Sequence, residues 1–406
     1  MNQANTARLS AMMFLQFFVW GAWYVTVGNF MASIGWGEYV YLPYLVNPIA
    51  AIAAPFFLGM VADRFFATER VLGVLHVLGG VALMLAPAVA SGGDTSVTPF
   101  VILILIHVLC YMPTLGLANS MAFHNITSQE KQFPVIRVFG TIGWIVANLV
   151  VSPILHADTE VLQFYVAGGA GVLLGLYSFS LPHTPPPAAG EKPTVARILG
   201  VDALKVLWNK PFAVFIISSM LICIPLAAYY TYAPILVSVA GAENPAGWMS
   251  IGQMTEVVFM LLIPIFFVRL GVKRMLLVGM AAWVLRYVLF AVAAPASIFW
   301  MIVVGVALHG ICYDFFFVTG QIYVDKRSTK EIRGQAQGFL VLATYGVGML
   351  IGAQIAGWIY NGLLVEGAEA LTPAAFQTFW MIPAVFAGIV MVLFGVFFND
   401  RVERSV

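Results

Sequence analysis

The stretch HTPPPAAGEKPTVARILGVDALKVLWNK, residues 183–210, is the longest hydrophilic segment of the chain and separates two apolar parts of similar length. Its three consecutive prolines, Pro185 to Pro187, and its alternating charges are typical of a linker. The segment therefore predicts two halves, residues 1–182 and 211–406, joined by a linker at 183–210.

The composition of the 406-residue chain excludes an ordinary soluble protein. Hydrophobic residues make up 61% and charged residues 9%, whereas a soluble domain carries roughly 25% charged residues. The mean hydropathy is +0.94, so lipid must be the solvent for most of this apolar surface. A net charge of +1 argues against a nucleic-acid partner. Cys110, Cys223 and Cys312 lie in apolar runs, which predicts small hydrophobic residues rather than disulfides or metal ligands.

A membrane-spanning helix needs about 20 apolar residues, and the runs between charged or Pro/Gly-rich breaks supply twelve candidates. We expect helices near residues 8–34, 39–62, 71–91, 98–123, 136–155, 161–181, 211–239, 248–269, 274–294, 297–324, 334–360 and 373–398. The first run is longer than the roughly 7–15 residues of a signal-peptide core, so we expect it to be a retained helix.

The basic residues orient these helices. With both termini in the cytoplasm, every Lys and Arg except Arg137 and Arg286 falls in a cytoplasmic segment. The external loops then carry acidic residues without basic ones: Glu38, Asp94, Asp158, Glu160, Glu243, Glu366 and Glu369. This agreement with the positive-inside rule predicts twelve transmembrane helices with cytoplasmic termini, because one missed or extra helix would reverse half of the loops.

Two loop motifs support the division into halves. The segment Gly59-Met-Val-Ala-Asp63-Arg64, followed by Arg70, resembles the G-x-x-x-D-R/K signature of the major facilitator superfamily. The corresponding loop of the second half, residues 269–274, is a degenerate copy. An ordinary basic turn would explain either loop alone. The resemblance implies an all-α fold in which two six-helix halves rock around a site near the membrane midplane.

Ionisable side chains inside membrane helices are costly and usually mark a functional pathway. The predicted helices contain Arg137, Glu256, Arg286 and Asp314, with the histidines at 76, 107 and 309 as further candidates. Apolar surroundings favour the neutral form of a carboxyl group, so Glu256 and Asp314 are candidate proton carriers. The alternatives are a purely structural Glu256, and an ion pair of Asp314 with Arg286 or Arg137.

Polar and aromatic side chains share helical faces with these charges. Arg137, Thr141 and Trp144 recur at i, i+4 and i+7, a stripe that suits a polar solute bearing a ring. The alternative for Arg137 is a position at the membrane boundary, where its side chain extends to the headgroups. Gln253 shares a face with Glu256 at a spacing of three residues.

Two further helices carry aromatic candidates. His309 and Tyr313 share one face of their helix, and Asp314 and Phe317 share the adjacent face. Tyr230 belongs to a tyrosine-rich run at residues 229–232, where rings could stack on a solute and donate hydrogen bonds. The alternative for this run is an aromatic belt at the membrane interface.

Short stretches over nearly the whole chain resemble the bacterial nucleoside:proton symporter family. They are Phe14–Trp23, Gly59–Asp63, Tyr111–Leu117, Phe133–Gly143, Ser250–Glu256 and Asp314–Phe316. The resemblance implies that Arg137, Thr141, Gln253, Glu256 and Asp314 handle substrate or protons. It implies a proton-coupled importer of nucleosides, not an enzyme, in the bacterial inner membrane. The proton gradient would be the energy source without a cofactor, and we expect a monomer.

The chain departs from this family at positions that face the substrate. Ala227 and Tyr230 stand where the family offers Gln and Asn, His309 where it offers Tyr, and Tyr313 where it offers Phe. The alternative hypothesis is therefore a proton symporter for another polar solute, such as a sugar or sugar derivative. The predicted substrate-binding residues are Arg137, Thr141, Trp144, Tyr230, Gln253, Glu256, His309, Tyr313, Asp314 and Phe317, with Glu256 and Asp314 also coupling to protons.

Overall fold

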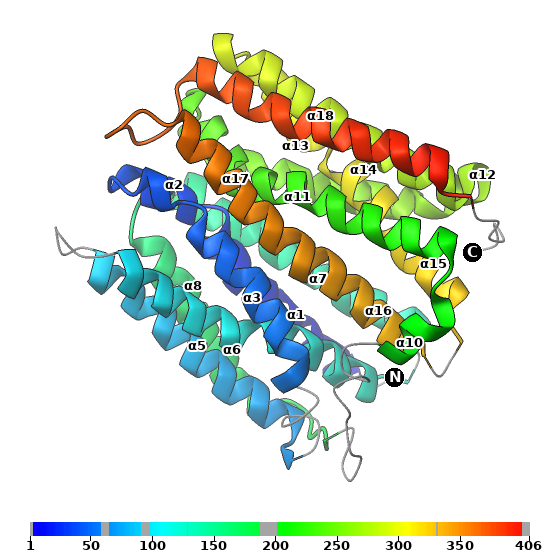
Figure 1. Cartoon of the computed structure of the whole chain (residues 1–406). Coiled ribbons are helices and arrows are strands. Elements are labelled where there is room, and N and C mark those ends of the chain that lie inside the picture. The colour runs from blue at the N-terminus through cyan, green and yellow to red at the C-terminus, as the bar shows by residue number, and fades with distance from the viewer. Residues whose placement is uncertain are drawn as a thin grey trace. The chain divides into compact units, whose positions relative to one another are not determined.

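The computed structural model describes residues 3–57, 65–90, 97–127, 129–186, 201–329 and 332–399. Within these ranges the chain forms helices and no strands (Figure 1). Nine helices in this part of the chain are long and apolar enough to cross a membrane. The prediction of an all-α membrane protein is thus confirmed. The motif at residues 59–64 and residues 187–200 of the predicted linker lie outside the described residues.

The chain divides into two compact units, which are Met1–Met31 with Ile49–Thr194, and Ala32–Pro48 with Val195–Val406. Residues 32–48 therefore group with the second unit, although they precede the predicted linker by more than a hundred residues. They do so because they pack on it: a Cβ at Gly357 would collide with the Tyr41 ring, and Asn361 donates to the Glu38 carbonyl at 2.8 Å.

The first unit is built from long helices with an apolar interior. They are α1 (Gln3–Tyr24), α5 (Thr68–Ala90), α6 (Val97–His124), α7 (Gln129–Leu149), which continues into the π-helical η3 (Val150–Ile154), and α8 (Leu162–Ser178). Two others, α2 (Val27–Ser33) and α3 (Leu42–Phe57), each contain a boundary between the units.

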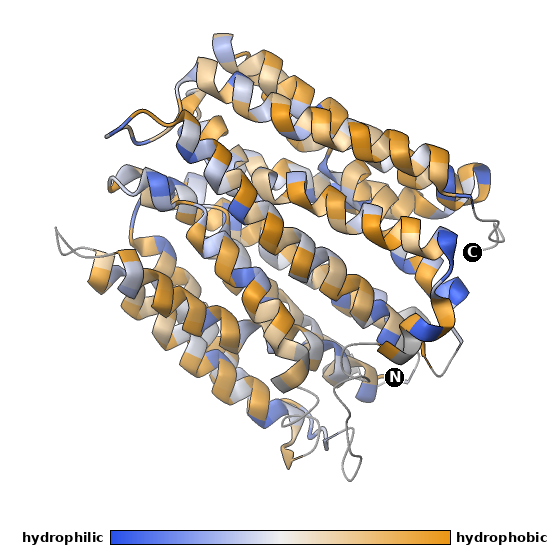
Figure 2. Ribbon diagram, viewed as in Figure 1, coloured by the Kyte–Doolittle hydropathy of each residue, from blue (hydrophilic) through white to orange (hydrophobic). Residues whose placement is uncertain are grey.

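Apolar side chains occupy both the inside and the outside of this unit. Leu9, Leu72 and Leu174 are fully buried in its core, whereas Leu173 and Leu176 on α8 are more than half exposed. Figure 2 shows the same pattern as orange along the helices, with blue gathered toward helix ends and loops. A helix that is hydrophobic all round is expected where lipid replaces water.

The second unit contains η1 (Gly37–Tyr39), α10 (Val201–Leu207), α11 (Lys210–Val239), α12 (Pro245–Ala293), η4 (Ala294–Ala296), α13 (Phe299–Ala307), α14 (His309–Tyr313), η5 (Asp314–Val318), α15 (Thr319–Arg327), α16 (Arg333–Val341), η6 (Leu342–Gly348), α17 (Met349–Leu363) and α18 (Pro373–Phe397). The stretches η5 and η6 are π-helical. In α12, Gly271 has φ 70° and ψ 174°, so the helix is interrupted between the predicted spans 248–269 and 274–294.

Local signals explain where two of these helices begin. The Asn209 side chain accepts a hydrogen bond from the Phe212 N–H at 3.0 Å, and Pro211 occupies the first turn of α11. The Thr372 hydroxyl accepts from the Ala375 N–H at 3.2 Å at the start of α18, which also opens with a proline. Each cap satisfies a backbone donor that has no partner within the helix.

The first residues of the predicted linker are attached to the first unit. The Glu69 carboxylate, at the start of α5, lies 2.8 Å from His183 Nδ1 and accepts from the Thr184 N–H at 3.0 Å. The Thr184 carbonyl in turn accepts from the Thr68 N–H at 2.9 Å. The chain therefore leaves α8 along the N-terminal end of α5.

Candidate functional site

The predicted site residues fall into two groups, one in each unit. In the first unit, α7 presents Arg137, Thr141 and Trp144, all half-buried. The guanidinium of Arg137 lies over the Phe17 ring of α1, 4.3 Å from its centre. This cation–π contact is a favourable interaction where water is scarce, and it holds the side chain against α1.

Glycines let α1 and α7 approach closely enough for this contact. A Cβ on Gly143 would collide with the backbone of Phe14, and a Cβ on Gly21 would lie 3.0 Å from the Trp144 carbonyl oxygen. Both positions therefore require the smallest residue, and together they set the distance between α1 and the stripe on α7.

Trp144 is held by neighbours on α1 and by one residue of its own helix. Its ring packs edge-on against Trp20 and Tyr24, with centres 5.4 and 6.2 Å away. When the Asn148 amide is oriented so that both its NH2 group and its oxygen form hydrogen bonds, the Asn148 oxygen accepts from the Trp144 indole N–H at 2.9 Å. Because that N–H is occupied, Trp144 offers a ring surface rather than a hydrogen bond.

A buried polar network near this stripe was not predicted as a unit. His76 lies 2.8 Å from Gln16 Oε1, the Gln16 amide donates to Thr114 at 2.7 Å, and the Tyr111 hydroxyl donates to the Gln16 carbonyl at 2.6 Å. Thr114 donates onward to the Tyr111 carbonyl at 2.5 Å. Since Gln16 Oε1 accepts, His76 donates through Nε2. The network ties α1, α5 and α6 together with neutral hydrogen bonds.

In the second unit, the structure brings the predicted charged residues together. His309 Nε2 lies 3.9 Å from the Glu256 carboxylate, and Glu256 is near enough to Asp314 for the two carboxylates to repel each other. Asp314 is fully buried, and neither of its oxygens has a hydrogen-bond partner among the described residues. A buried carboxylate without donors is costly in its ionised form.

Close packing of α12 and α14 positions this acidic pair. A Cβ on Gly310 would lie 2.5 Å from the Thr255 carbonyl group, so only glycine fits there. The Thr255 hydroxyl donates to the Ala307 carbonyl at 2.8 Å and accepts from the Gly310 N–H at 3.3 Å. These contacts bring the start of α14 against the residue that precedes Glu256.

The aromatic candidates of this unit form a continuous chain of rings. The ring centres of Tyr230 and His309 are 6.1 Å apart, those of His309 and Tyr313 5.6 Å, and those of Tyr313 and Phe317 5.1 Å. Gln253 lies on α12 one turn before Glu256, and its Oε1 has no hydrogen-bond partner in the described part of the chain. The unit therefore presents rings, an amide and an acidic pair.

Two tyrosines of the tyrosine-rich run of α11, Tyr229 and Tyr232, are fully buried inside the second unit. The guanidinium of Arg286 lies 4.0 Å from the centre of the Tyr229 ring, and its Nε donates to the Gly305 carbonyl at 2.9 Å. The terminal nitrogens of Arg286 have no hydrogen-bond partner among the described residues. The alternative pairing of Arg286 with Asp314 is therefore absent from this structure.

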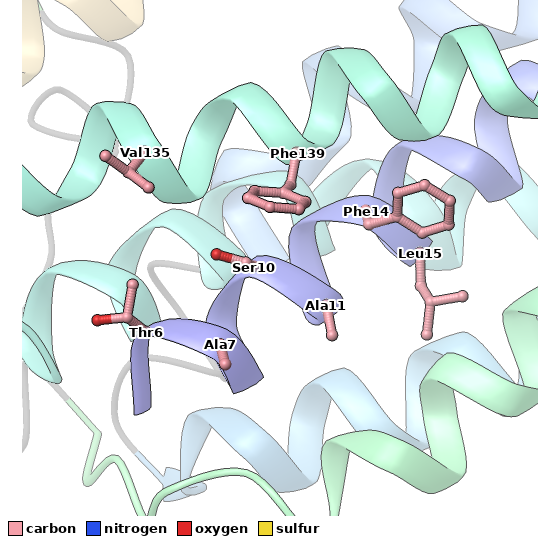
Figure 3. Close-up of a pocket in the computed structure, with 8 residues that line it drawn as sticks. All are labelled: Thr6, Ala7, Ser10, Ala11, Phe14, Leu15, Val135 and Phe139. Carbon is pink, nitrogen blue, oxygen red and sulfur yellow. The ribbon is translucent and has the colours of Figure 1, made fainter. Parts of the chain in front are cut away.

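A cavity of about 560 Å³ lies between α1 and α7 and is lined by Thr6, Ala7, Ser10, Ala11, Phe14, Leu15, Val135 and Phe139 (Figure 3). None of the predicted residues lines it. Nowhere in the described ranges do three or more His, Cys, Asp or Glu side chains gather as metal ligands.

Several known proteins are similar to this chain in sequence over nearly its whole length. A family model described as "Nucleoside H+ symporter" matches residues 3–403. The putative nucleoside transporter YegT of Escherichia coli (strain K12) is 38% identical over 98% of this chain and 94% of its own length. The xanthosine permease of the same organism is 33% identical over 96% and 94%, respectively.

Solved transporter structures superpose on this chain over most of its length. The crystal structure of the nucleoside transporter NupG superposes with a TM-score of 0.85 at 30% identity, covering 99% of this chain and all of that one. The POT family transporter PepTSo, at 14% identity and a TM-score of 0.70, shares the fold alone. The chain therefore belongs to the nucleoside H+ symporter family of membrane transporters.

Proposed function

We propose that this chain imports nucleosides across the bacterial inner membrane by symport with protons and alternating access. Its family membership and its similarity to proteins described as nucleoside and xanthosine permeases support this function. The structural observation that carries the proposal is the acidic pair of the buried Asp314 and the half-buried Glu256, which lies beside aromatic rings in the second unit.

The acidic pair suits proton binding because its two charges oppose each other. One proton removes the repulsion between Glu256 and Asp314 and the cost of an ionised Asp314 that has no donor. Glu256 also lies beside His309, which belongs to the chain of rings. Proton binding and solute binding therefore involve neighbouring groups, and such proximity couples the two affinities reciprocally.

The remaining residues supply groups that complement a nucleoside. Rings of Trp144, Tyr230, Tyr313 and Phe317 provide surfaces on which a base stacks. The guanidinium of Arg137, together with Thr141 and Gln253, provides donors and acceptors for sugar hydroxyls and base edges.

We also propose twelve transmembrane helices, cytoplasmic termini and a monomer. The distribution of basic residues supports this topology, and Gly271 divides α12 into two segments, one on each side of a basic loop. In a chain freed of its native cysteines, Glu38→Cys should react with a membrane-impermeant thiol reagent added outside intact cells. Arg274→Cys should react only after the membrane is opened, and the reverse labelling pattern would exclude this orientation.

Transport by purified protein in liposomes tests the function. Under an inward proton gradient, the liposomes should accumulate labelled uridine or adenosine, and a protonophore should abolish the accumulation. Glu256→Gln should lose accumulation because its side chain cannot exchange a proton. Glu160→Gln, at an exposed acidic residue, is the matched control. Full accumulation by Glu256→Gln would remove Glu256 from proton coupling.

Competition separates the two solute classes. Unlabelled nucleosides should inhibit uptake and raise the unfolding temperature of the purified protein, because a ligand that binds only the folded state stabilises it. If saccharides do both and nucleosides do neither, the alternative of a sugar symporter is correct.

A further inference from the structure

Asn47 is a buried amide on α3 that does not belong to the candidate site described above. Its side chain is 4% exposed, and neither its oxygen nor its nitrogen has a hydrogen-bond partner among the described residues. Within those ranges, every other Asn or Gln has at least one amide group that is paired or not fully buried. Burial of an unpaired amide costs free energy, so such a group in a native fold points to a role beyond packing.

The segment that carries Asn47, residues 32–48, packs on α17 and belongs to the second unit. Asn361 donates to the Glu38 carbonyl at 2.8 Å, and a Cβ on Gly357 would collide with the Tyr41 ring. As the segment advances from Glu38 to Tyr41, its partner on α17 moves back from Asn361 to Gly357. The segment therefore runs antiparallel to α17.

This antiparallel direction gives the level of Asn47 along its neighbours. Residues of both helices rise about 1.5 Å each, so Asn47, six residues after Tyr41, stands level with the residue six before Gly357. That residue adjoins Gly352, where a Cβ would lie 2.8 Å from the Ala227 Cβ of α11. Because Ala227 is near the middle of α11, Asn47 lies level with the middle of a helix long enough to cross the membrane.

The face of α3 that carries Asn47 is turned toward α11. Asn47 and Tyr44 are three residues apart and therefore share one side of the helix. Tyr44 lies near enough to Tyr232 of α11 for the two side chains to interact electrostatically. The α11 helix has no Asn or Gln of its own, but one turn from Ala227 it carries Tyr230, which begins the chain of rings at the candidate site. Asn47 thus adds an amide close to the level at which α11 presents a ring.

A carboxamide complements the edge of a nucleobase. It holds a donor and an acceptor side by side in one plane, and base edges hold the matching pair, as in the bidentate contact of Asn with adenine. When a base stacks on aromatic side chains, its edges stay open to hydrogen bonds of this kind. The level of Asn47 also suits this role, because transporters with two similar halves bind their solutes near the membrane midplane.

We propose that Asn47 is a further solute-binding residue, whose amide forms paired hydrogen bonds with the edge of the nucleobase and so selects among nucleosides. This inference rests on the proposed function. Together with Gln253 on α12, Asn47 gives the second unit two amides for recognition of the solute. The competing role is a structural one, in which Asn47 binds a buried water and affects stability without affecting selectivity.

The selectivity of uptake into liposomes at a fixed proton gradient tests the inference. Uridine and 3-methyluridine differ by one methyl group on the base N–H, whereas uridine and 2′-deoxyuridine differ in the sugar alone. In the unmodified chain, the KM for 3-methyluridine should be about tenfold that for uridine, the effect of one lost bidentate contact. In Asn47→Leu and Asn47→Ala, the KM for uridine should rise about tenfold and this ratio should fall to about one. The ratio for the sugar pair should not change. If the chain carries adenosine rather than uridine, N6,N6-dimethyladenosine and 2′-deoxyadenosine replace the two analogues.

Asn361→Leu is the matched control. It removes an amide that joins the same segment to α17 through the Glu38 carbonyl, so it should lower the unfolding temperature and leave both ratios unchanged. A base ratio that stays at its original value in the Asn47 variants would overturn the inference, and so would a change in the sugar ratio alone. If Asn47→Leu is too large to fold, the smaller Asn47→Ala decides. Absence of uptake by the unmodified chain would instead refute the proposed function, and this inference with it.

Discussion

Two buried polar clusters, one in each unit, differ in how far their hydrogen bonds are satisfied. In the first unit, neutral side chains of Gln16, His76 and Thr114 form a connected network with distances of 2.7 to 2.8 Å. In the second unit, Asp314 and Arg286 are fully buried, and both carboxylate oxygens and both terminal guanidinium nitrogens lack hydrogen-bond partners in the described part of the chain.

A buried network of hydrogen-bonded neutral side chains and a pair of buried charged side chains without hydrogen-bond partners have different energetic consequences. A satisfied neutral network rigidifies one arrangement of helices and loses energy when it rearranges. Unpaired buried charges each cost several kcal/mol, and inside a membrane they persist where ions or protons pass. We infer that the network of the first unit is a scaffold and that proton-dependent change is concentrated in the second unit.

The strongest test of this comparison is the neutralisation of Asp314. Asp314→Asn keeps the size of the side chain and removes its exchangeable proton. Uphill accumulation of nucleoside should fall to the level of protein-free liposomes, while exchange of labelled for unlabelled nucleoside at equal concentrations should persist. The measurement is uptake with and without a proton gradient in the same preparation.

The matched control is Asp325→Asn. The Asp325 side chain is 43% exposed and forms an ion pair with Arg333 at 2.7 Å, so its neutralisation should leave accumulation unchanged. Accumulation by Asp314→Asn equal to that of the unmodified chain would contradict the assignment of proton handling to the second unit.

A smaller effect is expected from Gly310→Ala. The added methyl group would meet the Thr255 carbonyl, and overpacking of this kind costs about 1–3 kcal/mol. The variant should unfold at a lower temperature and accumulate less nucleoside, because α14 moves away from the helix that carries Glu256. Gly388→Ala, where no atom lies within 4 Å of the added Cβ, should change neither quantity. Unaltered transport by Gly310→Ala would show that this contact does not position the acidic pair.

Gln16→Leu tests the scaffold of the first unit. It leaves the buried His76 N–H without its acceptor, which should cost about 1–2 kcal/mol of folding stability. The unfolding temperature should fall, while the nucleoside accumulation ratio of the folded protein stays unchanged. Gln377→Leu, on an exposed position of α18, is the control. A lost accumulation ratio in Gln16→Leu would break the proposed division between the units.

The helices were predictable because the bilayer imposes simple rules on length, apolarity and charge. The break between predicted spans 248–269 and 274–294 followed from Arg269, Lys273 and Arg274, and the structure interrupts α12 there at Gly271. The grouping of residues 32–48 with the second unit was not predictable. It depends on contacts such as that of Tyr41 with Gly357, which no local pattern reveals.

The site was predictable only where one helix carries the pattern. Shared faces selected Glu256, His309 and Tyr313, and the structure places them in one cluster. Tyr345, whose hydroxyl lies 2.7 Å from that of Tyr313, carries no charge and stands 32 residues away on a helix with a π-helical stretch. The position of Arg286 over Tyr229 likewise depends on packing between helices. The partner of Arg286 could therefore not be predicted from the sequence.

The smallest expected effect concerns Arg137, the one cation of the predicted site in the first unit. Arg137→Lys keeps the charge but loses the planar group that lies 4.3 Å from the centre of the Phe17 ring, a difference of about 0.5–1 kcal/mol. The KM for nucleoside should rise about two- to fivefold without loss of proton dependence. Phe17→Leu should produce a similar rise, and the two changes together should produce no more than either alone, because they disrupt the same contact. Arg274→Lys, at an exposed arginine, should leave the KM unchanged. Loss of proton dependence in Arg137→Lys would assign part of the proton coupling to the first unit. It would contradict the inference that proton-dependent change is concentrated in the second unit.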